Sequence, residues 1–302
     1  MKNKALNAHA ALIGGNLIFG LNFVISKGLM PRFFLPNDIV LYRIGGALIL
    51  FWLYGLFFKT EKIDKKDFAR LIVCGFFGVF LNQFMFFKGL NLTTPIDASI
   101  IQISNPVLIL LFAHFIHREK MSYSKILGIA LAGIGALAIV VEGTSAASKG
   151  SSLTGNLFIL INAISYAFYI VLSKPLTAKY KPHTLMKWIF LFGFIFATPL
   201  FYKTTSVSNY ANYSIEPWLS LFYVIFATTF LAYLFIISSM KNVSASVVGV
   251  YIYSQPLIAG ITAYFLGMGN FSFVKISAAL FIGFVVYLVS KTNQSKKPLT
   301  SP

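Results

Sequence analysis

The sequence predicts an all-α, polytopic membrane protein with ten transmembrane helices in two inverted five-helix repeats. Three observations carry this prediction. Of the 302 residues, 57% are hydrophobic and only 11% are charged, whereas a soluble domain carries about 25% charged residues. The apolar residues gather into long runs, each able to cross a hydrocarbon core of about 30 Å. Segments from the two halves of the chain also resemble each other in the same order.

The resemblance between the halves follows constant offsets. The run GNLIFGLNFVISK from Gly15 ends in Ser26-Lys27, and GNLFILINAISYAFYIVLSK from Gly155 ends in Ser173-Lys174. Further along, one offset superposes three pairs of residues: Pro106 on Pro256, Ser122 on Ser272, and Gly133 on Gly283. Two similar halves in an apolar chain indicate an internal duplication, which in membrane proteins often builds a transport path between the halves.

In the first repeat, predicted over residues 1–142, each span ends at a polar or proline-containing break. The first span is expected to be an uncleaved helix rather than a signal peptide, because its apolar run continues to Lys27 without a cleavage site. The following breaks are Pro36, the run KTEKIDKKD from Lys59, Thr94-Pro95, and HREK from His117. The five predicted spans are 8–26, 36–58, 69–87, 97–116 and 123–141.

A Gly/Ser/Ala-rich linker, 143–154, precedes the second repeat, which is predicted over 155–291 and is followed by a tail at 292–302. The breaks here are KYKP from Lys179, the polar run 203–216, Lys241-Asn242 and GMGN from Gly267. The five spans are 155–173, 184–202, 217–239, 245–266 and 273–290. No gap in the chain is long enough for a soluble domain.

The basic residues predict the orientation in the membrane. Of the 25 lysines and arginines, 18 fall on the side that holds both termini and six on the other, with Arg43 inside a span. Positive charge is retained on the cytoplasmic side, so both termini are expected in the cytoplasm, with the protein in the cell membrane. Because five spans is an odd number, the second repeat must enter the membrane inverted relative to the first.

The net charge of +17 raises the question of nucleic-acid binding. The lysines and arginines instead lie in short gaps between apolar runs, where membrane orientation requires them. We therefore expect no nucleic-acid partner; the expected partners are the lipid bilayer and a small-molecule solute.

An ordered set of residues resembles the drug/metabolite transporter superfamily, specifically the EamA-like permeases. The matching residues are Gly20-Leu21-Asn22-Phe23 with Ser26-Lys27, Pro36 before Arg43, Asn105-Pro106, the exit Glu119-Lys120-Met121-Ser122, and Gly155, Ala245 and Pro256 in the second half. The resemblance implies ten spans in two inverted repeats, cytoplasmic termini and transport of small metabolites, often outward. One departure is Gly269, which stands where the first half has Glu119.

Arg43 is the one charge deep inside a predicted span, and a charge there is a functional candidate because it is costly to bury in lipid. One interpretation is a contact with a carboxylate or other anionic group of a substrate. The other is a structural arginine that snorkels outward or ties helices together, with Asp38 as a candidate partner.

Uncharged polar side chains occupy corresponding spans in both halves, the first, third and fourth and the sixth, eighth and ninth. Amides facing lipid would lack hydrogen-bond partners, so these groups should point inward. Helix–helix hydrogen bonds could explain each one singly, but the matched placement favours a shared polar cavity. With Arg43, the predicted substrate-binding residues are Asn16, Asn22, Asn82, Gln83, Gln102, Asn105, Asn162, Tyr166, Thr229, Tyr233, Tyr251 and Gln255.

Pro106 and Pro256 interrupt the fourth and ninth spans, where proline removes a backbone donor and bends a helix. We expect these prolines to act as kinks or hinges. Small residues recur four apart in the fifth and tenth spans, at Gly128-Ala132-Ala136 and Ala279-Gly283. This spacing permits close helix packing, expected within the chain, with a homodimer as the alternative.

The residues that the sequence lacks also bound its function. The single cysteine, Cys74, excludes an internal disulfide or thiolate cluster, and no metal site, cofactor motif or nucleophile–base pair indicates an enzyme. All eight acids lie at span ends or in loops, and His114 is expected to be structural, so nothing supports coupling to protons. The prediction is a secondary transporter of small metabolites such as amino acids, working by alternating access; the alternatives are a passive channel and a non-transporting membrane scaffold.

Overall fold

The computed structural model describes residues 2–118, 150, 152–201 and 213–268 without Ser244 and Tyr253, and the isolated positions 273, 276, 277 and 280. Its described elements are all helical, with no strand among them, as predicted. Seven helical segments of this part are long and apolar enough to cross a membrane: Leu6–Leu29, Pro36–Phe57, Lys65–Leu92, Pro95–His117, Leu153–Lys179, Ile215–Ser239 and Val247–Phe265.

Ten spans in two inverted repeats stay a prediction. The predicted span 123–141 and nearly all of 273–290 lie outside the described residues, and with them the small-residue stripes. The predicted span 184–202 corresponds to the helix Pro182–Phe201. That helix is not among the seven.

Several spans are composed of more than one helical segment. Four other segments are single helices. They are α1 (Lys2–Leu29) and α2 (Pro36–Phe57) in the first half, and α8 (Leu153–Lys179) and α9 (Pro182–Phe201) in the second. The composite ones are α3 (Lys65–Gly75) with the π-helix η1 (Phe76–Leu81) and α4 (Asn82–Leu92); α5 (Pro95–Ile101) with the 3₁₀ turn η2 (Gln102–Ser104) and α6 (Asn105–His117); and α10 (Ile215–Phe222) with the π-helix η4 (Tyr223–Leu231) and α11 (Ala232–Ser239). α12 (Ala245–Ile252) and α13 (Ser254–Phe265) lie on either side of Tyr253, which is outside the described residues.

Local sequence sets several helix starts. α2 and α5 each begin with proline, which is preorganised for a first helical turn. At α5 the Thr94 hydroxyl also accepts a hydrogen bond from the backbone N–H of Asp97, at 3.1 Å. At α8 the Ser152 hydroxyl accepts one from the N–H of Gly155, at 3.0 Å. These side-chain caps satisfy donors that a helix start leaves open.

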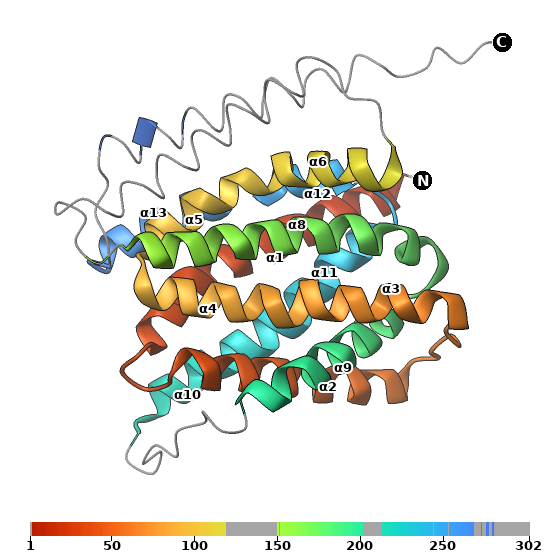
Figure 1. Ribbon diagram of the computed structural model, residues 1–302, viewed down its shortest axis with the longest axis horizontal. Helices are drawn as coiled ribbons and strands as arrows, with labels where there is room; N and C mark the ends of the chain where they lie inside the picture. The colour runs from red at the N-terminus through yellow and green to blue at the C-terminus, as the bar shows by residue number, and fades with distance from the viewer. Residues whose placement is uncertain are drawn as a thin grey trace.

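Helices from opposite halves of the chain pack together. α1 lies against α11 and α13, whereas α8 lies against α4 and α6. Figure 1 shows α8 running alongside α4 through most of the bundle. We call α1, η4, α11 and α13 the α1 group, and η1, α4, α6 and α8 the α8 group.

Glycines permit the tight contact between α8 and the η1–α4 segment. A Cβ added to Gly78 would lie 2.3 Å from the Tyr169 ring, and one added to Gly155 would lie 2.8 Å from the backbone of Leu92. Either substitution would force the helices apart. The close approach fixes the depth of the polar residues that these helices carry.

The segment α5–η2–α6 packs against the segment α12–α13. Pro106 stands at the start of α6 directly after η2, and Pro256 stands near the start of α13. α6 packs against α12, and α5 packs against α13. At this contact, a Cβ on Gly249 would lie 3.2 Å from Pro106 Cα. Pro106 therefore lies at the change from η2 to α6, and Pro256 lies within α13; the role of both prolines as hinges is a proposal.

Candidate functional site

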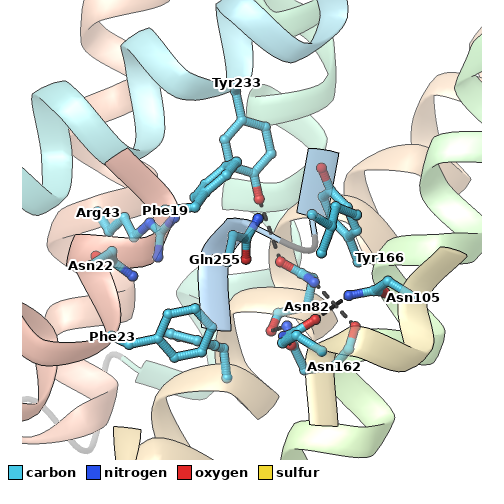
Figure 2. Close-up of a pocket in the computed structure, with 13 residues that line it drawn as sticks. Phe19, Asn22, Phe23, Arg43, Asn82, Asn105, Asn162, Tyr166, Tyr233 and Gln255 are labelled. Atoms are coloured by element: carbon cyan, nitrogen blue, oxygen red, sulfur yellow. Dashed lines mark hydrogen bonds between the residues drawn. The ribbon is translucent and has the colours of Figure 1, made fainter. Parts of the chain in front are cut away.

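A polar cavity lies between the two helix groups, near the contact between α5–η2–α6 and α12–α13. Its free volume is about 60 Å³, which is room for a few waters and is below the roughly 300–1,000 Å³ of small-molecule sites. Figure 2 shows side chains from several helices converging on it. The lining residues are Phe19, Asn22, Phe23, Arg43, Asn82, Phe86, Gln102, Asn105, Asn162, Tyr166, Tyr233, Ile252 and Gln255.

Nine of the residues predicted from the sequence line this cavity. They come from both halves of the chain, and all but Tyr166 are at least nine-tenths buried within the protein. They are Asn22, Arg43, Asn82, Gln102, Asn105, Asn162, Tyr166, Tyr233 and Gln255.

Arg43 supplies the only charge among the lining residues. Its side chain is 4% exposed, its Nε donates a hydrogen bond to the Thr229 hydroxyl, and its guanidinium carbon lies 5.4 Å from the centre of the Phe87 ring. Thr229 in turn donates to the backbone oxygen of Val224, five residues earlier in η4, at 2.7 Å. One face of the arginine is thus anchored while the side chain still reaches the cavity wall.

A chain of amides forms the opposite wall. Asn105 donates to Gln102, and Gln102 donates to the side-chain oxygen of Asn162. Asn162 and Asn82 each donate to the other's backbone oxygen, at 2.8 and 3.2 Å. This network leaves the Asn105 side-chain oxygen buried without a hydrogen-bond partner. A buried acceptor of this kind is costly unless something donates to it, so it suits a ligand donor or a water.

Tyr233 and Gln255 join these walls to the α1 group. The Tyr233 hydroxyl donates to the Gly78 backbone oxygen at 3.2 Å and lies 3.4 Å from the Asn82 side-chain oxygen. Gln255 donates to the Asn16 side-chain oxygen at 2.7 Å. The cavity therefore joins donors and acceptors from both helix groups.

Four predicted residues do not line the cavity. Asn16 supports Gln255 from behind, and Thr229 supports Arg43. Gln83 is 1% exposed and lies outside the lining set. The Tyr251 hydroxyl pairs with His9 Nδ1 at 2.7 Å, in the N-terminal part of α1. Which spans carry polar residues was readable from the sequence, but how each helix is rotated against its neighbours was not.

The sequence reasoning missed the apolar part of the lining, which is Phe19, Phe23, Phe86 and Ile252. The signal was available for two helices. Phe23 follows Phe19 by four residues, and Phe86 follows Asn82 by four, so the members of each pair share a helix face. The cavity consequently combines aromatic surface with amides and one cation.

The π-helices η1 and η4 were also not predicted, and each bonds to a residue that lines the cavity. The backbone oxygens of Phe77 and Gly78 in η1 accept hydrogen bonds from Ser165, at 2.5 Å, and from Tyr233. In η4, Thr229 orients Arg43. π-Helical turns are rare and concentrate at functional sites. Within the described residues, no group of three or more His, Cys, Asp or Glu could hold a metal ion.

Comparisons with known proteins agree with this architecture. The model of the EamA-like transporter family matches residues 6–141 and 153–291. Among curated relatives, the uncharacterized transporters YetK and YyaM of Bacillus subtilis (strain 168) are 28% and 27% identical to this chain. The alignments cover 96% and 92% of this chain and 89% and 92% of theirs. A crystal structure whose name states no function shares the fold, with a TM-score of 0.64 and 19% identity over 98% of this chain and all of that one.

Proposed function

We propose that this chain, which belongs to the EamA-like transporter family and is a multi-pass membrane transporter, is a secondary transporter of small organic solutes such as amino acids. The solute binds in the central cavity, and the protein works by alternating access with ten spans in two inverted repeats. The single observation that carries this proposal is a polar cavity, with one buried cation, between helices of both halves.

The cavity chemistry supports a solute with an anionic group and an apolar body. A guanidinium matches the planar geometry of a carboxylate and can donate two parallel hydrogen bonds to it. The Phe19, Phe23 and Phe86 side chains offer apolar surface beside Arg43. On the other wall, the free oxygen of Asn105 can accept a hydrogen bond from an amine or hydroxyl of the solute.

The purified protein, screened against a metabolite panel, should show a raised melting temperature with a solute that binds the folded state. With the best solute in hand, Arg43→Ala should weaken binding by about 100-fold, on the scale of a lost charged hydrogen bond of about 3 kcal/mol. Arg32→Ala is the matched control, because Arg32 is exposed and lies over the Phe33 ring. Unchanged binding in Arg43→Ala would leave Arg43 a structural role through Thr229 and Phe87.

Flux in proteoliposomes separates the mechanisms. A carrier gives saturable uptake that is accelerated by solute on the opposite side, whereas a channel gives uptake without trans-stimulation. No flux of any panel solute, together with no stabilisation, would support the scaffold alternative instead.

A further inference from the structure

Lys27 makes a three-point contact near the end of α1. Its ammonium donates to the backbone oxygens of Leu90, Asn91 and Thr93 at 2.9, 3.0 and 2.8 Å. These carbonyls belong to the last turn of α4 and the residues just after it. The last carbonyls of a helix have no partner within the helix and carry its negative dipole end, so a lysine is a suitable cap.

Lys174 makes the same contact in the second half of the chain. Its ammonium donates to the backbone oxygens of Met240 and of Val243, the latter at 2.8 Å, just past the end of α11. Met240 and Val243 lie 150 positions after Leu90 and Thr93, the same offset that superposes Pro256 on Pro106. Lys174 also closes the repeated Ser-Lys pair that Lys27 closes in the first half. The two lysines are therefore equivalent in sequence and in bonding.

Each lysine links the two helix groups. Lys27 stands on α1, which packs mainly on α11 and α13, but its ammonium binds the end of α4 in the α8 group. Lys174 stands on α8, which packs mainly on α4 and α6, but its ammonium binds the end of α11 in the α1 group. A cap within one rigid group would only stabilise a helix, whereas these two bonds join groups with the cavity between them.

The two links lie at opposite ends of the molecule. α1 runs away from the N-terminus and α8 runs back toward that end, as Figure 1 shows. Lys27 is near the last residue of α1 and Lys174 is in the last third of α8. The cavity, with Phe23 and Tyr166 in its wall, thus has one lysine link toward each end.

We propose that Lys27 and Lys174 are equivalent latches, one at each end of the cavity, and that each must release the helix end it holds before the cavity opens to that side. This inference rests on alternating access, the mechanism proposed above. Because the acceptors are backbone carbonyls, the latches do not depend on an acidic partner. Loss of one latch should bias the protein toward the state that is open at that end.

Accessibility of a cavity residue tests the latches without requiring a known solute. The background is Cys74→Ala, which removes the single cysteine, a buried one. A reporter, Phe23→Cys, is then labelled with a membrane-impermeant thiol reagent from each side of oriented proteoliposomes. Lys27→Met should raise the labelling rate from one side about fivefold or more and lower it from the other, and Lys174→Met should do the reverse. The fivefold figure is the lower end of typical coupling free energies between two sites.

Matched controls separate latching from loss of a lysine. Lys88→Met, in α4, and Lys187→Met, in α9, remove half-buried lysines that lie over the Phe84 and Trp52 rings. These should leave the ratio of the two labelling rates unchanged. The double variant Lys27→Met/Lys174→Met should return the ratio toward that of the parent. Should a single variant fold poorly, Lys27→Arg and Lys174→Arg keep a donor and give smaller shifts of the same sign.

The outcomes distinguish this proposal from the one on which it rests. Suppose that the reporter labels from both sides, but that the ratio of the two labelling rates is unchanged in Lys27→Met and Lys174→Met, or shifts the same way in both. That result would overturn the latches and leave alternating access intact. If neither Phe23→Cys nor a second reporter, Gln255→Cys, labels from more than one side in any variant, alternating access itself fails.

Discussion

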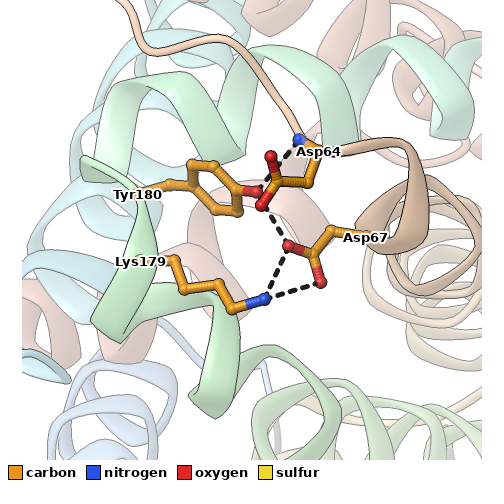
Figure 3. Close-up of polar contacts among 4 residues, drawn as sticks. All are labelled: Asp64, Asp67, Lys179 and Tyr180. Atoms are coloured by element: carbon orange, nitrogen blue, oxygen red, sulfur yellow. Dashed lines mark hydrogen bonds and ion pairs between the residues drawn. The ribbon is translucent and has the colours of Figure 1, made fainter.

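The two ends of the molecule are held together by different physics. At the end that holds the N-terminus, Lys179 lies 2.9 Å from the Asp67 carboxylate. The Tyr180 hydroxyl donates to the same carboxylate at 2.7 Å and accepts from the backbone N–H of Asp64 at 3.1 Å (Figure 3). At the other end, Phe34 is 1% exposed and packs edge-to-face against the rings of Tyr42, Tyr213 and Trp218, with centroids 5.7–6.2 Å apart.

We call the contacts of Asp67 with Lys179 and Tyr180 the polar junction, and the ring cluster around Phe34 the aromatic junction. Each joins residues at a helix connection in the first half of the chain to residues at a helix connection in the second. The polar one connects the link between α2 and α3 to the end of α8, and the aromatic one connects the link between α1 and α2 to the segment that enters α10. One end is thus closed by a partly exposed ion pair and the other by a buried ring cluster. Salt should therefore weaken the polar junction more than the aromatic one.

The largest expected effect is at the aromatic junction. Phe34→Ala should lower the free energy of unfolding by about 3 kcal/mol, because it leaves a cavity beneath three packed rings. Thermal unfolding in detergent measures this, with Phe57→Ala as control since Phe57 is 82% exposed. A loss as small as that of the control would show that the ring cluster does not close this end.

A smaller effect is expected at the polar junction. Asp67→Asn removes the ion pair with Lys179 and weakens the acceptor of Tyr180, and it should cost about 1 kcal/mol because Lys179 is 53% exposed. Most of that cost should vanish in about 1 M salt, where the screening length falls to about 3 Å. Lys66→Ala, an exposed neighbour, is the control. The comparison would be contradicted if the cost of Phe34→Ala fell in high salt while the cost of Asp67→Asn did not.

The smallest expected effect is the pH dependence of the same end. Burial acts to raise the pKa of Glu61, but hydrogen bonds from the Thr184 hydroxyl, at 2.6 Å, and from the Lys181 backbone hold it below its usual value. The stability that this carboxylate contributes is present above its unfolded pKa of about 4.3 and is lost as the pH falls through the folded value.

At high pH, ionisation of Tyr180 should lower the stability of the same end. Burial, with the bond to Asp67, raises its pKa, so its contribution is complete below about pH 10 and is lost as the pH rises through the folded value. Unfolding followed against pH should show a smaller acid limb in Glu61→Gln and a smaller alkaline limb in Tyr180→Phe. An acid limb unchanged in Glu61→Gln, or an alkaline limb unchanged in Tyr180→Phe, would assign the titration to other groups such as Asp67.

Hydropathy and periodicity, which are local properties, determined the all-helical class, the positions of most spans and the polar stripe on each helix. This is because lipid requires every span to satisfy its own backbone and to turn polar side chains inward. Asn22, Asn82 and Asn162 could be predicted as cavity residues for that reason, and Lys27 and Lys174 could be recognised as a repeated pair.

Only the tertiary structure decided which polar residues meet one another. Asn16 and Thr229 stand one layer behind the cavity because contact between α1 and α13, and between α2 and η4, places Gln255 and Arg43 in front of them. The π-helical turns and the bonds of Lys27 and Lys174 depend on close approach between helices that are distant in the chain. A local pattern identifies the face of a helix, but packing against a distant helix fixes its rotation and depth.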